Sequence, residues 1–524
     1  MRRFTLTLLA ASLVIGLAQA ATPKDTLVVA IPLDGIISFD PAEAFETVSN
    51  GSLRNIYEQL VTLDRNDSQK LVPGLASAWQ PGSNEHSLRF TLRDGARFAS
   101  GNAVTPQDVI FSFSRAVRLN KSPAFILAEL GWTPENVDSH LKATGDNQVE
   151  ISWDAGIGRD LVLRLLTAPV ASIVDGKLAT QHQQQDDKGN GWLRTHSAGS
   201  AAYRIRQYVP QQALVLEKNN YAQHAAQLKN VILKNVAEAS SRRLLIQQGD
   251  VDVAYQLGPD QFAALKQQPG VKVENYPSDL VFYLGFNTQN KQQPLLGNPA
   301  FWQAARWLVD YKSLADELLK GQYQVHQSFL PQGFDGALNT TPFHYDVEKA
   351  KAILNQAGIK PGSHFSLTVI NQPPYIDVAQ ALQASFAAAD VHIDIQPVAE
   401  AELWGKMRGR DFQSIFIYWG ADYPDAHSNA SAFASNVPGG AKTLAWRTGW
   451  EIPKISAETR AAAAESDATQ RRTRYTQLQT ELQQNSPYVT ILQGQQLVAL
   501  RDNLQGAQQG IGNSLLWFDQ LIKN

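Results

Sequence analysis

Hydrophobic and polar residues alternate along several short segments, and this period of two predicts strands that are buried on one face. The alternating segments are 88–92, 149–153 and 214–216. Further strands are predicted at the apolar segments 27–31, 282–287 and 414–419. The first of these is followed by Pro32, which cannot continue the hydrogen bonding of a strand ladder.

A period near 3.6 predicts helices between these strands. Asp346 can cap a helix that places apolar residues on one face and stops at Gly358. A longer pattern at 456–484 predicts one long helix, which ends before Pro487. Because strands alternate with helices along the chain, we expect α/β lobes.

The N-terminus has the features of a signal peptide. Arg2 and Arg3 supply the positive charge, 4–17 is apolar, and 18–20 (AQA) forms a small-x-small cleavage site. The mature chain is therefore predicted to begin at Ala21. A transmembrane anchor is the alternative, but the apolar stretch is shorter than the ~20 residues that a span needs.

Composition narrows the possible functions. The chain has 524 residues, 44% of them hydrophobic, and a formal net charge of −3 with no long basic run, so nucleic acid is not an expected partner. It has 0 cysteines, which excludes disulfides, thiolate nucleophiles and a lipid-modified cysteine behind the leader. A soluble export without a lipid anchor fits a Gram-negative periplasm.

The sequence motifs of catalysis are missing. The chain has no G-x-S-x-G elbow, no H-E-x-x-H motif and no G-x-x-x-x-G-K-[ST] loop. It is therefore not the ATPase of a transporter, and a secreted hydrolase is only a distant alternative. No cofactor and no metal site are predicted, because the grouping of His427 with nearby aspartates has irregular spacing.

Several sequence fragments occur in a characteristic order. They are 55–61 (NIYEQLV), 88–95 (LRFTLRDG), 98–101 (FASG), 108–113 (DVIFSF) and 419–425 (WGADYPD). In this order they resemble a periplasmic solute-binding protein of the dipeptide/oligopeptide (family 5) class of ABC importers. The segment 199–203 (GSAAY) departs from the G-T-G-P-Y of that family, so we expect a turn of a different shape there.

The resemblance implies a fold and a domain organisation. The fold would be α/β, a two-lobed periplasmic-binding-protein fold (type II-like) with an additional inserted domain. The expected boundaries are 1–20 for the signal peptide, 21–50 with 195–275 and 490–524 for lobe I, 51–194 for domain II, and 276–489 for lobe III.

The resemblance also implies a role as a binding protein and not as an enzyme. The chain would capture a short peptide in the periplasm, as a monomer, and deliver it to an inner-membrane ABC permease and its ATPase. An opine-like amino acid conjugate, an oligosaccharide or a nickel complex is the alternative ligand.

Asp422 is the first candidate ligand-binding residue. It follows the apolar segment that ends at Trp419, and ligands of α/β lobes bind beyond the carboxyl ends of strands. Peptide-binding members of the family place an aspartate at this W-x-x-D position and pair it with the α-ammonium of the ligand. The alternative is an Asx-turn aspartate that holds its own loop. Asp425 is expected to be structural.

Aromatic residues flank this aspartate, and Tyr418, Trp419 and Tyr423 are candidate walls of the binding site. Core packing is the alternative for Trp419. Arg447 lies in an aromatic-flanked loop, where its guanidinium could bind a ligand carboxylate or phosphate. Its alternative is a surface position, stacked on a neighbouring tryptophan.

Phe39 and Asp40 belong to a segment that resembles an early part of the family, often near the cleft. Both are therefore candidate ligand contacts as well.

Overall fold

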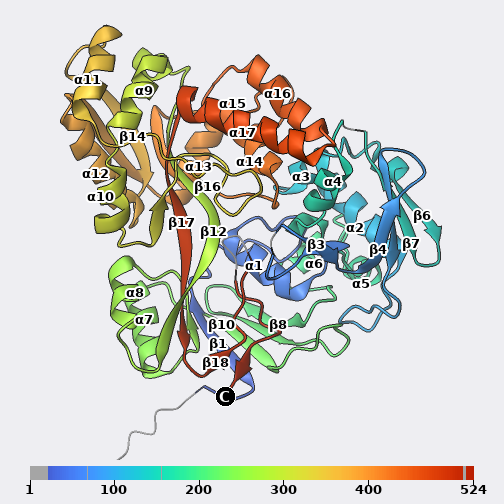
Figure 1. Ribbon diagram of the computed structural model, residues 1–524. Helices are drawn as coiled ribbons and strands as arrows, with labels where there is room; N and C mark the ends of the chain where they lie inside the picture. Colours follow the sequence, from blue (N-terminus) through green and yellow to red (C-terminus); the bar gives the residue numbers. More distant parts are fainter. Residues whose placement is uncertain (1–21, 68, 155, 511–514) are drawn as a thin grey trace, which may run out of the picture.

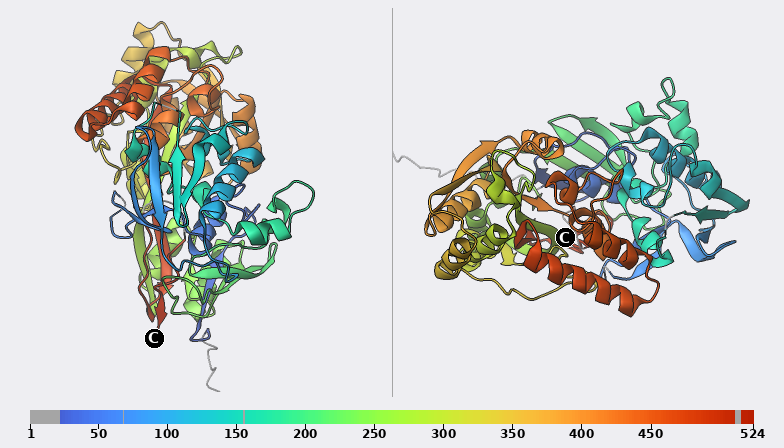
Figure 2. Two further views of the ribbon diagram at one scale, coloured as in Figure 1. Left: turned by 90° about the vertical axis from the view of Figure 1, so that its right-hand side faces the viewer. Right: turned by 90° about the horizontal axis from the view of Figure 1, so that it is seen from above.

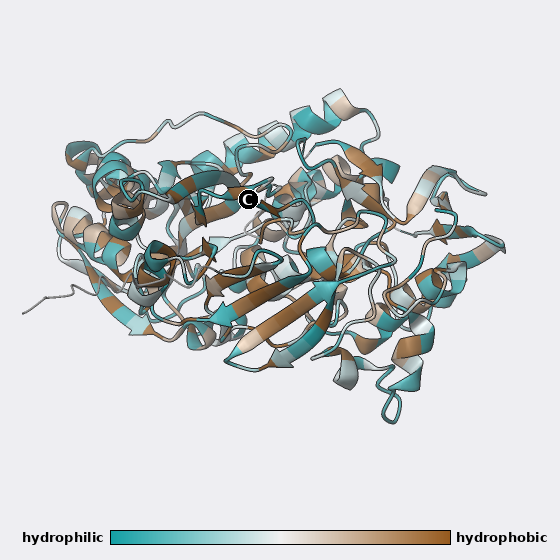
Figure 3. Ribbon diagram, turned by 90° about the horizontal axis from the view of Figure 1, so that it is seen from below, coloured by the Kyte–Doolittle hydropathy of each residue, from teal (hydrophilic) through white to brown (hydrophobic). Residues whose placement is uncertain are grey.

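The computed structural model describes residues 22–67, 69–154, 156–510 and 515–524, so the predicted signal peptide lies outside the described residues. Its largest element is a mixed 11-stranded sheet. The strand order is β15 (Val391–Val398), β14 (Ser363–Ile370), β16 (Ser414–Trp419), β12 (Val271–Phe286), β17 (Tyr488–Arg501), β11 (Val253–Ala254), β1 (Thr26–Ile31), β10 (Asn230–Asn235), β9 (Ala213–Lys218) and β8 (Tyr203–Val209), with β13 (Tyr323–Val325) beside β17. Hydrophobic residues concentrate on these strands (Figure 3).

Two long antiparallel strands, β12 and β17, join the two halves of this sheet (Figure 1). Their pairing runs from Val271 and Arg501 in one lobe to Gly285 and Tyr488 in the other. The register shifts between Pro277 and Val281, so residues 278–280 lie outside the regular ladder. In the described chain, β12 and β17 are the only strands that connect the lobes within the sheet, and their pairing is irregular at the centre.

Lobe I contains β1, which lies between two parallel neighbours, β10 and β11, and is buried along its length. Burial on both faces explains its continuous apolar sequence. One face packs against α7 (Ala239–Gln248) and α8 (Pro259–Leu265). The other face packs against α1 (Thr47–Ile56) and the C-terminal segment with β18 (Leu504–Gln505) and β19 (Ile522–Lys523).

The inserted domain is built on a separate four-stranded sheet. Its strands are β4 (Ala76–Pro81), β5 (Ser87–Leu92), β7 (Gln148–Ser152) and β6 (Leu141–Gly145), and β2 (Val61–Leu63) pairs with β3 (Leu71–Pro73) nearby. Helices α2 (Pro106–Leu119), α3 (Ala124–Ala128) and α4 (Arg159–Leu165) complete its core. The neighbouring α1, α5 (Gly176–Gln181) and α6 (Asn190–Leu193) contribute side chains to the core of lobe I instead.

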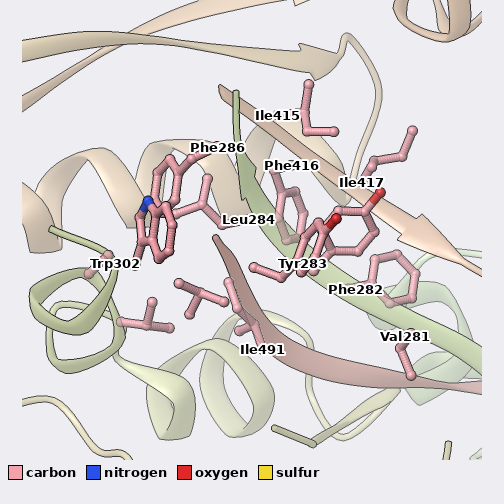
Figure 4. Close-up of a cluster of buried hydrophobic side chains, with 14 of the residues drawn as sticks. Val281, Phe282, Tyr283, Leu284, Phe286, Trp302, Ile415, Phe416, Ile417 and Ile491 are labelled. Carbon is pink, nitrogen blue, oxygen red and sulfur yellow. The ribbon is translucent and has the colours of Figure 1, made fainter. Parts of the chain in front are cut away.

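Lobe III has the largest hydrophobic core, and all of its buried residues come from one continuous stretch between Val281 and Leu492. Figure 4 shows aromatic side chains of β12 and β16 packed in this core. Its helices are α9 (Pro299–Trp307), α10 (Tyr311–Ser313), α11 (Val347–Gln356), α12 (Tyr375–Ala387), α13 (Glu400–Gly409), α14 (Ala426–Phe433), α15 (Leu444–Arg447), α16 (Pro453–Ala464) and α17 (Ala468–Asn485).

The predicted strands are confirmed, as is the helix that Asp346 caps through a hydrogen bond from the Lys349 backbone. The single long helix predicted at 456–484 is wrong, because the chain forms α16 and α17 with a break between them. At the break, the Asp467 side chain accepts a hydrogen bond from the Gln470 backbone. Such a cap starts a new helix instead of continuing the old one.

The fold is thus the predicted α/β arrangement of two lobes with an inserted domain (Figures 1 and 2). The inserted domain lies beside lobe III, and the two are in contact through α3, α4 and the loop after β16. Among the residues that the structure describes, none of the helices combines the length and the apolar character that a membrane span requires.

Candidate functional site

A cavity of about 110 Å³ lies where the inserted domain meets lobe III. The inserted domain contributes Phe125 and Glu129, from α3 and the residue that ends it. Lobe III contributes Trp419, Asp422 and residues of α14 and of the stretch 435–443. Residues of both the inserted domain and lobe III therefore line the cavity.

The end of β16 determines which of the predicted aromatic residues face this cavity. Successive side chains of a strand point to opposite faces, so Tyr418 and Trp419 diverge. Trp419 lines the cavity, and its indole N–H is buried without a hydrogen-bond partner among the described residues. Tyr418 instead donates its hydroxyl to Glu400, 3.2 Å away, and its ring packs beside Phe282. The structure therefore does not bring Tyr418 to the cavity.

Asp422 lies in the loop after β16. Its backbone N–H donates to the Ser428 hydroxyl at 2.8 Å, which ties the loop to α14. Its carboxylate makes no hydrogen bond to its own loop and no ion pair with any described residue. An Asx turn would require a hydrogen bond from the loop backbone to this carboxylate. Burial raises the pKa of Asp422 to about 7, the charge of Asp279 adds to this, and Arg447 opposes it.

Asp425, three residues later, is fully engaged. Its carboxylate accepts hydrogen bonds from the His427 backbone at 2.8 Å and from two nitrogens of Arg471 at 2.6 and 2.9 Å. Arg164 of the inserted domain lies 3.6 Å away. Burial alone would raise the pKa of Asp425, but Arg471 brings it below the ordinary value. This aspartate has the structural role expected for it.

Glu129 is the carboxylate that the inserted domain places in the cavity. The Tyr423 hydroxyl donates to Glu129 Oε2 at 2.6 Å, while the Tyr423 ring packs in the core of the inserted domain. The only basic side chain nearby in the described chain is His427, at 3.9 Å, and burial lowers the pKa of that imidazole to about 4. Burial raises the pKa of Glu129 to about 8. The hydrogen bond from Tyr423 opposes that shift, and the negative charges of Asp422 and Asp425 add to it.

Two arginines face the same region. The guanidinium of Arg447 lies 5.9 Å from the centre of the Trp419 ring, and its Nε donates to the Lys442 carbonyl. Arg54 of α1 lies over the Trp517 ring, and its buried Nη1 has no hydrogen-bond partner in the described chain. Burial lowers the pKa of Arg54 to about 10, and the negative charge of Asp279 opposes that shift.

The structure places the two early candidates elsewhere. Both oxygens of the Asp40 carboxylate accept hydrogen bonds from Arg115, and Asn190 binds it as well. Phe39 is fully buried, with its ring centre 4.9 Å from that of Tyr208. Asp40 thus links lobe I to the inserted domain, while Phe39 packs in the core of lobe I, and neither lines the cavity.

Sequence reasoning missed Glu129, Asp279 and Arg54. Glu129 follows an apolar run and looks like an ordinary solvated residue at a helix end. Asp279 interrupts β12 where the lobes join. Only the tertiary structure brings Glu129 and Asp279 close to the loop that carries Asp422, and Arg54 close to Asp279.

Comparisons with known proteins are consistent with this architecture. The family model described as bacterial extracellular solute-binding proteins, family 5 middle, matches residues 70–441. The chain is 28% identical over 496 residues to a probable D,D-dipeptide-binding periplasmic protein of Escherichia coli, which covers 93% of this chain and 92% of the relative. It is 26% identical to the nickel-binding periplasmic protein of that organism, with 83% of each chain covered.

Solved structures share the fold. A periplasmic binding protein of Helicobacter pylori in complex with the peptide STSA has a TM-score of 0.79 at 22% identity, with 95% of this chain and 98% of that chain covered. A dipeptide-binding protein of Pseudoalteromonas in complex with Met-Leu has a TM-score of 0.80 at 19% identity, with 95% and 100% covered.

Proposed function

The chain belongs to family 5 of the bacterial extracellular solute-binding proteins, and from this premise we propose that it captures short peptides in the cleft between its domains. The observation that carries the proposal is the carboxylate of Asp422, which is half-buried in the lining of the cavity and has no cation in contact with it in the described chain. The α-ammonium of a peptide would supply that cation.

The physical argument is one of charge compensation. A buried carboxylate is unfavourable unless a cation neutralises it and donates hydrogen bonds to it. Low polarity around a closed cleft strengthens such a pair. Arg447 lies close enough to Asp422 to influence its charge, so one short zwitterion could engage both residues. In this proposal Arg447 binds the terminal carboxylate of the peptide.

The transport role rests on the family and on the hinge. Ligand binding between lobes that are joined by β12 and β17 would favour the closed arrangement. The closed protein would then be recognised by an inner-membrane ABC permease and its ATPase, the partners that membership of the family implies. The proposal places the protein in the periplasm and involves no covalent chemistry.

Isothermal titration calorimetry on the mature protein, refolded from denaturant to remove bound ligand, tests the proposal. The panel contains L-Ala-L-Ala, D-Ala-D-Ala, tripeptides, an opine, an oligosaccharide and a nickel salt. We expect peptides with free termini to bind and Asp422→Asn to abolish the signal. Asp411→Asn is the matched control, because Asp411 is an exposed aspartate of the same lobe. Binding of the sugar or the opine alone would overturn the peptide assignment.

A further inference from the structure

We infer that Glu129 is a second ligand contact, which holds the cationic amino end of the peptide together with Asp422 from the opposite side of the cleft. The inference rests on the proposed function and adds a residue of the inserted domain to it. The contact would make closure of the inserted domain onto lobe III depend on the charge of the ligand.

The first support is geometric. Glu129 and Asp422 line one cavity, although one ends α3 of the inserted domain and the other follows β16 of lobe III. The Tyr423 hydroxyl fixes Oε2 of Glu129 at 2.6 Å. Oε1 has no hydrogen bond in the described chain, so it is available to a ligand.

The second support is the charge of the surrounding groups. Of the neighbouring acids and bases, Asp425 is neutralised by Arg471 and Arg164, and the Tyr475 hydroxyl contacts His427. Arg447 acts on Asp422 but forms no ion pair with Glu129. Two carboxylates therefore share a small cavity, and no cation among the described residues is in contact with either.

An ammonium group fits this arrangement chemically. It carries one positive charge and three N–H donors, which can serve both carboxylates and still leave one donor for a hydroxyl of the cavity wall. Without a cation, two ionised carboxylates in this space repel each other, and opening of the cleft relieves the repulsion. A peptide with a blocked amino end lacks the charge and should not favour closure.

The test is a comparison of affinities for L-Ala-L-Ala, D-Ala-D-Ala and their N-acetylated forms. Glu129→Gln keeps the size of the side chain and an oxygen that can accept the Tyr423 hydroxyl, but removes the charge. We expect it to weaken binding of the free dipeptide at least about tenfold, or ~1.4 kcal/mol. Binding of the N-acetylated form should change little, so the ratio of the two affinities should shrink. Glu135→Gln, at an exposed glutamate of the same domain, should leave the ratio unchanged.

Tyr423→Phe provides a second variant, because it keeps the ring in the core and removes only the hydroxyl that positions Glu129. It should reduce the ratio of the affinities for the free and the N-acetylated dipeptide, but by less than Glu129→Gln does. Small-angle scattering should show that L-Ala-L-Ala compacts the wild type more than Glu129→Gln.

The possible results separate the two proposals. If Asp422→Asn loses binding while Glu129→Gln and Tyr423→Phe bind like the wild type, the role of Glu129 is overturned and the peptide function stands. If the wild type binds neither dialanine, the dipeptide assignment fails and the inference fails with it.

Discussion

Three acidic residues lie at the boundary between the inserted domain and lobe III. One of them, Asp425, differs from Asp422 and Glu129 in how its negative charge is balanced. Asp425 is held by Arg471 of its own lobe and approached by Arg164 of the inserted domain. Asp422 and Glu129 share a cavity with no cation in contact with either in the described chain. Asp425 is thus neutralised within the protein, whereas in our proposal the ligand supplies the cation for Asp422 and Glu129.

The difference shows why chemically identical residues in one loop can have separate roles. Asp422 and Asp425 lie three positions apart, yet only Asp425 caps α14 and faces two guanidinium groups. A carboxylate that is neutralised by arginines can hold the inserted domain and lobe III together whether or not a ligand is present. A group with uncompensated charge can instead make their association depend on the ligand.

Removal of the neutralised group should have the largest effect. Asp425→Ala leaves Arg471 buried without its partner and deletes the cap of α14, so we expect a loss of about 3–5 kcal/mol in the free energy of unfolding. Urea denaturation measures this loss, with Asp411→Ala as the exposed control. A loss no larger than that of the control would contradict the structural role of Asp425.

Asp422→Asn should affect binding and not stability. We expect the dipeptide affinity to fall about 100-fold, or ~2.7 kcal/mol, because the ammonium loses its counter-charge. The free energy of unfolding of the ligand-free protein should stay the same or rise, since a buried carboxylate disappears. Calorimetry and urea denaturation on the same preparation test both parts, and a large loss of stability would show that Asp422 is structural.

The two groups should respond to pH in opposite directions. The raised pKa of Glu129 means that the folded protein holds a proton that the unfolded chain releases between about pH 5 and pH 8. The free energy of unfolding should therefore fall as pH rises through this window, by about 1–3 kcal/mol from this group. The lowered pKa of Asp425 has the opposite sign, because its contribution is present above the ordinary value of 3.8 and is lost in acid.

Denaturation of the ligand-free protein across this pH range measures the trend. Subtraction of the Glu129→Gln profile isolates the contribution of Glu129 from that of the other groups. Parallel profiles for the variant and the wild type would show that Glu129 does not change protonation on folding.

The smallest effect is expected at Trp419. Trp419→Phe removes an indole N–H that has no partner in the described chain but keeps an aromatic wall of the cavity. The free energy of unfolding should change by less than about 1 kcal/mol. Dipeptide affinity should fall only a few-fold, and a larger loss in calorimetry would identify the indole N–H as a direct ligand contact.

The sequence predicted those parts of the molecule that local pattern determines. Alternation identified the strands, and the apolar segment before Asp422 placed this residue beyond a strand end. The break before Asp467 was missed, because a helical period continues across it while a single capping aspartate starts a new helix. The contact of Asp40 with Arg115 could not be predicted, because Arg115 comes from a helix of another domain.

Glu129 could not be predicted for a related reason. Its environment depends on the Tyr423 hydroxyl and on the contact between two domains, neither of which leaves a trace in the residues around it. A carboxylate at a helix end is ordinary in sequence, and only burial near other carboxylates makes it a candidate for recognition.

The two strands that link the lobes also make lobe III a candidate for independent folding. The chain enters it on β12 and leaves it on β17, and the two crossing points are paired neighbours. All residues of its core come from the stretch between them, so a fragment spanning this stretch would contain a complete core with adjacent ends. Asp422, Trp419 and Arg447 lie within that stretch, and excision of lobe III would separate this half of the proposed binding site from Glu129.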